Sequence, residues 1–231
     1  MLLPQNLKVF FLCFFFGCSQ VFAHSASLEF YGNQNYELKY SKQVYKDYEL
    51  NVRSQKFEKN FEGRAGTKIC LIFCFTLPVE EKNLQIESYS VFIKKEFSDV
   101  FSDYDLGKLS AGFGISYDNV KAKTAGSVST SGVSTNFVKF LINTEHKYPI
   151  EVFGKKFNIE TFLEYGFFNQ SEADVKEWLL KTQLIYDFKE DTFLSFGYKL
   201  RDIDINYVKE EEIIDLKGKE NTIFVGVKRI W

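Results

Sequence analysis

The stretch NTIFVGVKRIW, residues 221–231, decides the fold class. Apolar and polar residues alternate along it: Ile223, Val225 and Val227 against Thr222, Gly226 and Lys228, with Trp231 at the end. Alternation with period two is typical of a strand that has one apolar and one polar face. Chain ends are commonly polar and frayed. We therefore expect this last strand to be paired along its whole length.

The same alternation recurs through most of the chain. It is clearest at 109–117, 157–167, 178–188 and 192–202, and less regular at 27–41, 45–54, 69–77, 84–97 and 134–146. In the last of these, Val138, Phe140 and Ile142 are in phase whereas Phe137 and Leu141 are not. With 223–231 this predicts about ten strands, or eight if the first hundred residues pair differently. Helical spacing competes only at 172–182, where a short helical turn leading into a strand at Trp178 satisfies both signals.

The composition favours one folded domain rich in strands. Of 231 residues, 45% are hydrophobic and 18% aromatic, with 26 Phe and 13 Tyr, and such residues suit strands and membrane interfaces. Only 3 Pro and 14 Gly argue against disorder. A net charge of -2 gives no indication of nucleic-acid binding.

The first 23 residues have the pattern of a secretory signal peptide. Lys8 is followed by an apolar run at 9–17, and Val21-Phe22-Ala23 has the form of a cleavage site. Cleavage after Ala23 leaves a mature domain of 24–231. The alternative is lipidation at Cys18, because Phe15-Phe16-Gly17-Cys18 resembles a degenerate lipobox.

The sequence predicts no metal site, cofactor or catalytic residue. Cys70 and Cys74, placed on one strand, would lie ~13 Å apart, beyond disulfide reach without a bend. A metal site would need more ligands than these cysteines with His24 and His146. No G-x-S-x-G nucleophile motif is present in the sequence.

Links between the later strands alternate between long and short. Those at 119–133 and 204–220 are predicted to be long polar loops, and those at 146–149 and 189–191 to be short turns. Outer-membrane barrels have short periplasmic turns and longer outward loops. If Trp231 ends in the periplasm, both short links fall on that side.

Residues 221–231 resemble the C-terminal insertion signal of bacterial outer-membrane β-barrels. The matching positions are Ile223, Val225, Val227 and Trp231, whereas Arg229 departs from the apolar residue that is usual there. The resemblance is to small single-chain barrels of the opacity and surface-antigen type. It implies an all-β, antiparallel up-and-down transmembrane barrel in the cell outer membrane. Outer-membrane lipid and the barrel-assembly machinery are its implied partners.

Three functions are consistent with these features. The favoured one is a monomeric, non-catalytic outer-membrane barrel with a structural or surface-exposed role, whose loops 119–133 and 204–220 offer surfaces to an extracellular partner. The second is a soluble periplasmic barrel that carries a lipid or other apolar ligand, with inside and outside exchanged. The third is a lipid-modifying barrel enzyme or small pore, for which His146 is the one candidate base inside the barrel.

The polar face of the strands predicts a filled lumen. Barrels of eight to ten strands are mostly filled by their own side chains. Lys181 or Lys199 is expected to pair with Glu160 or Glu164 across the interior, which favours a plugged barrel over a conducting one.

Trp231→Ser is expected to impair membrane insertion far more than secretion. The signal peptide acts first, whereas insertion needs the last strand to be recognised and paired, because unpaired backbone in lipid is unfavourable by several kcal/mol per group. The measurement is the ratio of heat-modifiable, membrane-embedded protein to soluble periplasmic protein. Arg229→Tyr is the control, expected to leave insertion unchanged or improved. Normal insertion of the Trp231 variant would contradict the insertion-signal interpretation.

Overall fold

The computed structural model describes residues 24–31, 35–60, 62–70, 74–76, 82–97, 107–124, 133–170, 172–189, 191–209 and 212–231. Twelve strands lie in these ranges: β1 (His24–Tyr31), β2 (Asn35–Tyr45), β3 (Tyr48–Asn60), β4 (Glu62–Cys70), β5 (Cys74–Thr76), β6 (Lys82–Glu96), β7 (Lys108–Thr124), β8 (Val133–Val152), β9 (Lys155–Gln170), β10 (Ala173–Lys189), β11 (Thr192–Lys209) and β12 (Glu212–Ile230). No helix long and apolar enough to cross a membrane occurs in these ranges.

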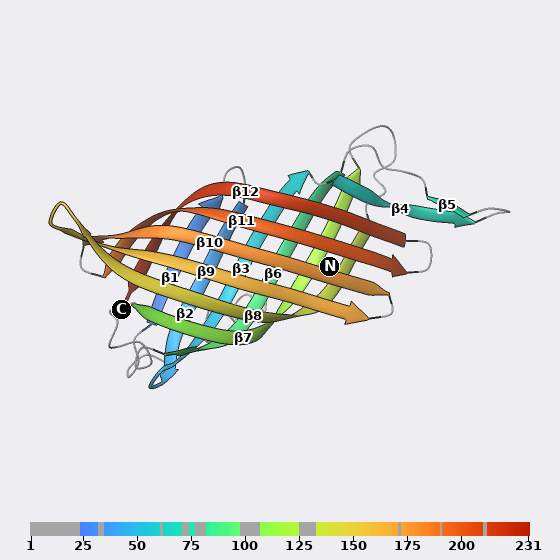
Figure 1. Ribbon diagram of the computed structural model, residues 1–231. Coiled ribbons are helices and arrows are strands. Elements are labelled where there is room, and N and C mark those ends of the chain that lie inside the picture. The colour runs from blue at the N-terminus through green and yellow to red at the C-terminus, as the bar shows by residue number, and fades with distance from the viewer. Residues whose placement is uncertain are drawn as a thin grey trace.

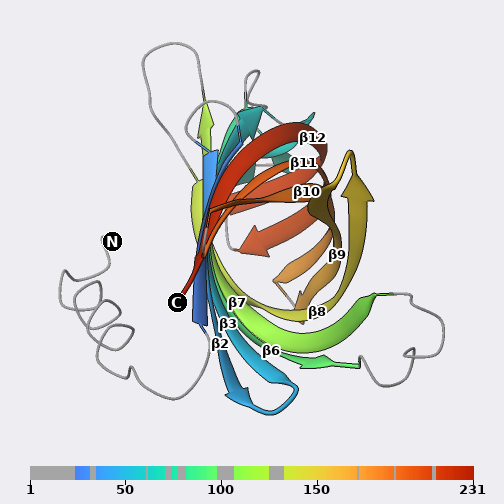
Figure 2. The same cartoon turned by 90° about the vertical axis from the view of Figure 1, so that its left-hand side faces the viewer.

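Ten of the strands close into one antiparallel up-and-down barrel (Figures 1 and 2). The order is β1-β2-β3-β6-β7-β8-β9-β10-β11-β12, and β1 pairs with β12 to close the ring. At the seam the His24 and Trp231 backbones exchange hydrogen bonds of 3.3 and 3.0 Å. We call the end of the barrel where β1 begins and β12 finishes the terminal end, and the opposite end the far end.

The wall changes from ten strands to eight along the barrel axis. Residues 225–230 of β12 pair with β1, but residues 212–217 pair with β4. β4 follows β3 after one residue. Both run in the same direction, because β3 is antiparallel to β6, β4 is antiparallel to β12, and β6 and β12 both run toward the terminal end. Beyond the β1–β2 hairpin, β4 therefore takes the hairpin's place beside β12. Ten and eight strands, the two predicted numbers, apply at different heights.

Asn35 and Tyr31 hold the tip of the β1–β2 hairpin in the wall. The Asn35 side-chain oxygen accepts a hydrogen bond from the Glu58 backbone N–H (2.7 Å), and its amide nitrogen donates one to the Glu58 carbonyl (3.2 Å). The Asn35 side chain thus satisfies both backbone groups of Glu58, as a residue on a neighbouring strand would. Tyr31 packs on Phe224 of β12, with 5.1 Å between ring centroids.

Near the terminal end the barrel is apolar outside and charged inside. The apolar face of these strands points outward, since Phe113, Leu163, Leu184, Phe196 and Val225 are all exposed. The outward positions of 109–117 in β7 and 178–186 in β10 are mainly apolar over nine residues each. A tilted strand needs ~9–11 residues to cross a bilayer. We call this part of the barrel the charged tier, after its lumen.

Toward the far end the two faces exchange polarity, although the alternation continues. The lumen there is filled by buried apolar side chains: Phe57, Leu84, Ile86, Val120, Phe137, Val175, Ile203, Ile205, Ile214 and Leu216, with Phe168 and Tyr207 packed against them. The outward neighbours are polar: Lys56, Glu58, Gln85, Glu87, Asn119, Lys121, Asn136, Asn169, Asp174, Lys176, Asp202, Asp204, Asn206, Asp215 and Lys217. The exchange involves all eight strands that enclose the lumen here. We call this part the apolar tier.

The polarity exchange explains why the long loop predicted at 204–220 is wrong. β11 continues to Lys209 and β12 begins at Glu212, so most of this range is strand. The charged residues that suggested a loop are the outward face of the apolar tier. Similarly, strand covers much of the predicted 119–133 loop, since β7 ends at Thr124 and β8 begins at Val133. Phe137, out of phase in the sequence, faces the lumen of this tier.

Other predicted boundaries also shift. The turn predicted at 146–149 lies inside β8, and the chain turns instead at Phe153 and Gly154, both with positive φ (52° and 72°), still at the terminal end. β10 starts at Ala173 without a helical turn. The predicted strand 27–41 is two strands, β1 and β2, whereas 69–77 falls on β4 and β5, outside the ten wall strands.

The expectation that Cys70 and Cys74 lie on one strand is also wrong. The chain reverses between β4 and β5, and these two residues are backbone partners across the antiparallel pair. The separation argument against a disulfide therefore does not apply. Cys13, Cys18 and the signal peptide lie outside the described residues, so those predictions stay untested.

Arginine substitutions should separate the two tiers. Phe196→Arg on the outward face of the charged tier should lower the free energy of unfolding by ~2–4 kcal/mol. Asp204→Arg, outward on the apolar tier, should change it by at most about 1 kcal/mol, because that surface is solvated. Ile205→Arg, which buries an unpaired charge, should lower it by ~3–5 kcal/mol.

The measurement is urea unfolding of protein refolded into lipid vesicles. If the Asp204 and Phe196 variants lost equal stability, the boundary between the tiers would be misplaced.

Candidate functional site

The lumen of the charged tier holds almost equal numbers of buried acids and bases. Among the described residues the buried bases are Arg53, Lys94, Lys139, Lys181, Lys199 and Arg201, and the buried acids are Glu29, Glu37, Asp118, Glu145, Glu164, Glu177 and Glu220. Burial of an unpaired charge is strongly unfavourable. The interior must therefore be organised as ion pairs.

Several of these pairs cross the lumen between strands that are not neighbours. Arg53 of β3 contacts Glu164 of β9 at 2.6 Å and also donates to the Ser90 hydroxyl. Lys181 of β10 binds Glu29 of β1 and lies 3.5 Å from Glu37 of β2. These bridges tie opposite walls together and fill the space between them.

The boundary with the apolar tier is a second charged layer. Lys139 contacts Asp118 at 2.7 Å and also binds Glu177, whose other oxygen lies 2.6 Å from Arg201. The Arg201 guanidinium stacks over Phe57 of the apolar tier, 4.7 Å from the ring centroid. Arg201 thus satisfies a carboxylate on one side and covers an apolar ring on the other.

Two glycines of β7 make room for the inward side chains of β6. A Cβ at Gly114 would lie 2.4 Å from the Phe92 Cβ and 2.3 Å from the Val91 carbonyl oxygen. A Cβ at Gly112 would lie 2.8 Å from Lys94 Cγ. Residues without a side chain at these positions let Phe92 and Lys94 fold against the wall.

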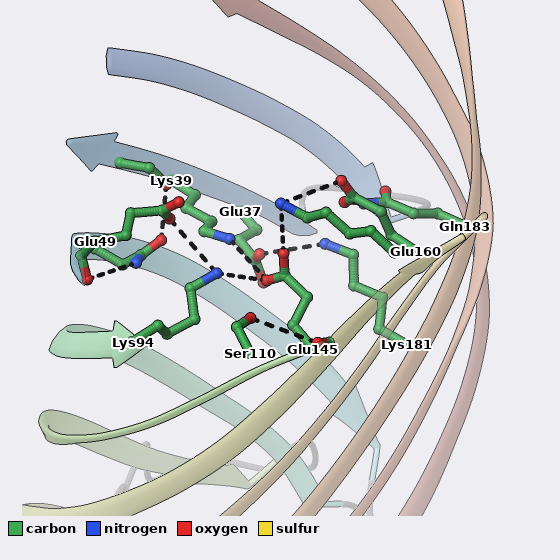
Figure 3. Close-up of polar contacts among 12 residues, drawn as sticks. Glu37, Lys39, Glu49, Lys94, Ser110, Glu145, Glu160, Lys181 and Gln183 are labelled. Carbon is green, nitrogen blue, oxygen red and sulfur yellow. Dashed lines mark hydrogen bonds and ion pairs between the residues drawn. The ribbon is translucent and has the colours of Figure 1, made fainter. Parts of the chain in front are cut away.

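Toward the terminal end, Glu145 gathers three lysines. Its carboxylate lies 2.6 Å from Lys94, 2.8 Å from Lys147 and 3.6 Å from Lys39 (Figure 3). Glu49 and Glu160 give partial compensation, at 3.5 Å from Lys94 and 3.6 Å from Lys147. Three ammonium groups around one carboxylate leave this end of the lumen rich in positive charge.

A polar cavity opens beside this cluster at the terminal end. Its volume is about 350 Å³, within the range of small-molecule sites. Its charged lining is Lys46, Lys94, Lys108, Lys147 and Lys228 with Asp47, Glu49 and Glu96. A deeper cavity of about 60 Å³ shares Lys147 and Lys228 and continues to Glu37, Lys181 and Gln183. We call the two cavities together the basin.

The predicted lumen pairings are only partly confirmed. Lys181, Lys199 and Glu164 are buried in the interior as expected. Their predicted partners are wrong: Lys181 binds Glu29 and Glu37, and Lys199 lies over the Tyr31 ring at 4.2 Å. Glu160 lies 3.6 Å from Lys147 and accepts a hydrogen bond from Gln183.

The positions of the predicted insertion signal lie on the outward face of β12. Ile223, Val225 and Val227 are exposed there, and Trp231 meets the His24 ring edge-on at 5.0 Å. Trp178 lies at the opposite edge of the outward apolar band, 4.3 Å from the Tyr165 ring. These placements suit interfacial aromatic residues. The recognition role of the four positions stays a prediction.

His146 does not reach the lumen. It lies on the outward side of β8, opposite the phase of buried Glu145, near Tyr148 (6.4 Å between ring centroids). Within the described ranges no three His, Cys, Asp or Glu side chains are grouped closely enough to hold a metal ion. The chemistry that the described lumen supports is charge pairing and ion recognition by Lys, Arg, Glu and Asp.

No protein-family model and no curated protein matches the chain. Among solved structures it is similar to outer-membrane OmpT of Vibrio cholerae, with 14% identity over 85% of the chain and a TM-score of 0.33. The match spans 56% of OmpT, about half its length. The N-terminal β-barrel domain of Pseudomonas aeruginosa OprF gives 13% identity over 91% of this chain and 96% of that one, with a TM-score of 0.33. Neisserial surface protein A gives 9% identity, 90% and 93% coverage, and a TM-score of 0.33.

A double-mutant cycle on Arg53 and Glu164 should measure how strongly the lumen depends on bridging pairs. Arg53→Met or Glu164→Met alone strands a buried charge and should lower the free energy of unfolding by ~3–5 kcal/mol. The double variant should lose less than either single one, because no uncompensated charge remains. Urea unfolding in lipid vesicles gives the three values. Additive losses would mean that the two side chains act independently.

Proposed function

We propose that the protein is an integral outer-membrane barrel that crosses the bilayer with its charged tier and extends into water with its apolar tier. The observation that carries the proposal is the exchange of polarity between the two faces at one height around the barrel. Below it the outward face is apolar, with Phe113 69% and Phe196 58% exposed. Above it the outward face is charged. A hydrocarbon slab on one side of this level and water on the other fits both surfaces.

The same observation disfavours a soluble carrier of an apolar ligand. Such a barrel would have polar residues outside and an apolar cavity inside. In the charged tier the arrangement is reversed, and in the apolar tier the interior is occupied by packed side chains of the protein itself. A water-soluble state would leave Phe113, Phe196 and Ile223 in contact with water.

We propose that the terminal end faces the periplasm and the far end faces outward. Outer-membrane barrels have their longer extensions on the outer side, and the far end carries the strand extensions and the β4–β5 hairpin (Figure 1). Its outward surface carries exposed pairs such as Lys217–Asp204 (2.9 Å) and Lys219–Asp202 (3.6 Å). This solvated surface suits a structural role or contact with an extracellular partner. The partner itself stays a proposal.

We also propose that the barrel neither conducts nor catalyses. Ion pairs bridge the charged tier, and the apolar tier above them offers no polar path for an ion. Catalysis on outer-leaflet lipid would need a general base near the far end. His146 lies near the terminal end and outside the lumen, which supports a non-catalytic role.

Site-specific labelling tests the location and the orientation. Single cysteines at Asn206, Phe196 and Lys46 would be introduced after Cys13, Cys18, Cys70 and Cys74 are changed to Ser. A membrane-impermeant maleimide should label Asn206→Cys on intact cells, and Lys46→Cys only after the outer membrane is permeabilised. Phe196→Cys should react only after the membrane is dissolved in detergent.

Two outcomes would contradict the proposal. Labelling of Phe196→Cys in a detergent-free soluble fraction would favour the soluble barrel. Discrete current steps from the purified protein in planar bilayers would contradict the closed lumen.

A further inference from the structure

We propose that the basin binds a small zwitterion with one carboxylate and one ammonium group, of the size of a free amino acid or dipeptide. This inference rests on the proposed orientation only in assigning the ligand to the periplasm. The binding chemistry follows from the side chains that line the basin.

The basin is a blind pocket. It opens at the terminal end, where His24, Lys46 and Lys108 line the rim. Toward the far end it meets the bridging ion pairs of Lys181 and Arg53, and behind these the packed apolar tier. A ligand that enters therefore returns by the same opening. This geometry suits retention of a small molecule rather than its passage.

Lys228 supplies the group for a carboxylate. It lines both parts of the basin, and none of the close ion pairs among the described residues includes it, although the Glu160 carboxylate attracts its charge from a longer distance. Lys147 lines the same two cavities; it contacts Glu145, which it shares with Lys39 and Lys94, and it lies 3.6 Å from Glu160. A ligand carboxylate at Lys228 and Lys147 would offset this excess of positive charge. Charge-assisted hydrogen bonds are about twice as strong as neutral ones.

Glu37 and Gln183 supply the groups for an ammonium. Both line the deeper cavity. The Glu37 carboxylate is buried and shares Lys181 with Glu29 through one oxygen, while its Oε2 has no hydrogen-bond partner among the described residues. Gln183 donates to Glu160, but its own Oε1 likewise accepts no hydrogen bond there. Two buried acceptors beside the deeper cavity lack a donor among the described residues, and a ligand with hydrogen-bond donors could supply one.

Figure 3 shows Glu37 and Glu145 in the middle of this cluster, with Glu160, Lys181 and Gln183 on one side of them and Lys39, Glu49 and Lys94 on the other. Acceptors without a described donor on one side, and a cation without a close described carboxylate on the other, define two poles. A molecule with only a carboxylate would leave the inner acceptors unused. A molecule with only an amine would leave Lys228 unpaired. The zwitterion uses both.

The test is calorimetric titration of the purified full-length barrel in detergent with the dipeptide alanyl-alanine. Two analogues are matched controls: the N-acetyl dipeptide, which lacks the ammonium, and the dipeptide amide, which lacks the carboxylate. Alanyl-alanine should bind, and each analogue should bind at least about tenfold more weakly, as expected for loss of one charge-assisted contact. Equal binding of the N-acetyl analogue would reduce the site to a simple anion site and overturn the proposal.

Variants assign the two poles. Lys228→Gln should weaken binding of alanyl-alanine at least about tenfold but leave the dipeptide amide unaffected, because the amide has no carboxylate to lose. Glu37→Gln should also weaken binding of alanyl-alanine, but it should leave binding of the N-acetyl analogue unaffected, because that analogue has no ammonium group to lose. Lys217→Gln, on the outward face of β12, should bind as wild type.

Heat-modifiable migration confirms that each variant is folded. Absence of binding by folded wild-type protein, or equal binding by all variants, would overturn the inference. These titrations are independent of orientation, whereas cysteine labelling tests orientation without any ligand, so failure of one proposal is distinguishable from failure of the other.

Discussion

The backbone of a strand in hydrocarbon needs a partner for every N–H and C=O group, because the bilayer offers none. The β12 edge is paired at both of its ends, although only the terminal end has an apolar outer face. Along 225–230 the partner is β1, and along 212–217 it is β4, the continuation of β3. The short β1–β2 hairpin thus widens only part of the barrel, and the Asn35 amide satisfies the β3 edge at the hairpin tip. The ten-strand part is the wider one, and it is there that the charged lumen and the basin lie.

The polarity of the inner face and that of the outer face are linked by the two-residue period of the strand. Because successive side chains point to opposite faces, a change of phase that places polar residues outside places apolar residues inside. The same strands thus form a charged lumen with an apolar outer face at one end, and an apolar core with a polar outer face at the other. Packing of Phe57, Ile205 and Leu216 fills the lumen at the far end. The charges below this layer are then confined between a closed end and an open one.

Alternation in the sequence was sufficient to predict the closed barrel, its outward face and the number of wall strands, since period two reports strand geometry directly. The prediction failed where the apolar residues move from the outward to the inward positions of the strands. Residues 204–206 continue the alternation of the preceding strand, yet they fall in the predicted loop because their outward side chains are polar. The lumen partners were beyond reach for another reason. Lys181 meets Glu29 more than 150 residues away, through space that only the closed wall defines. The antiparallel pairing of β4 with β5, which makes Cys70 and Cys74 partners, was likewise not predictable, because the sequence between them contains no Gly, Pro, Asn or Asp to indicate a turn.

A lumen of this width can be filled with charges only if nearly all of them are paired, and pairing across the barrel removes the space that an ion would need. The ion pairs that cross the lumen therefore both neutralise the buried charges and block the channel. Lys199 is buried over the Tyr31 ring without a close described carboxylate, whereas a charge at the open end can be solvated. Lys228 is half-buried at that end, whereas Arg53, Lys139 and Arg201 are each committed to carboxylates deeper inside. A small charged molecule can therefore reach Lys228, which lines the basin and makes no close ion pair with a described residue.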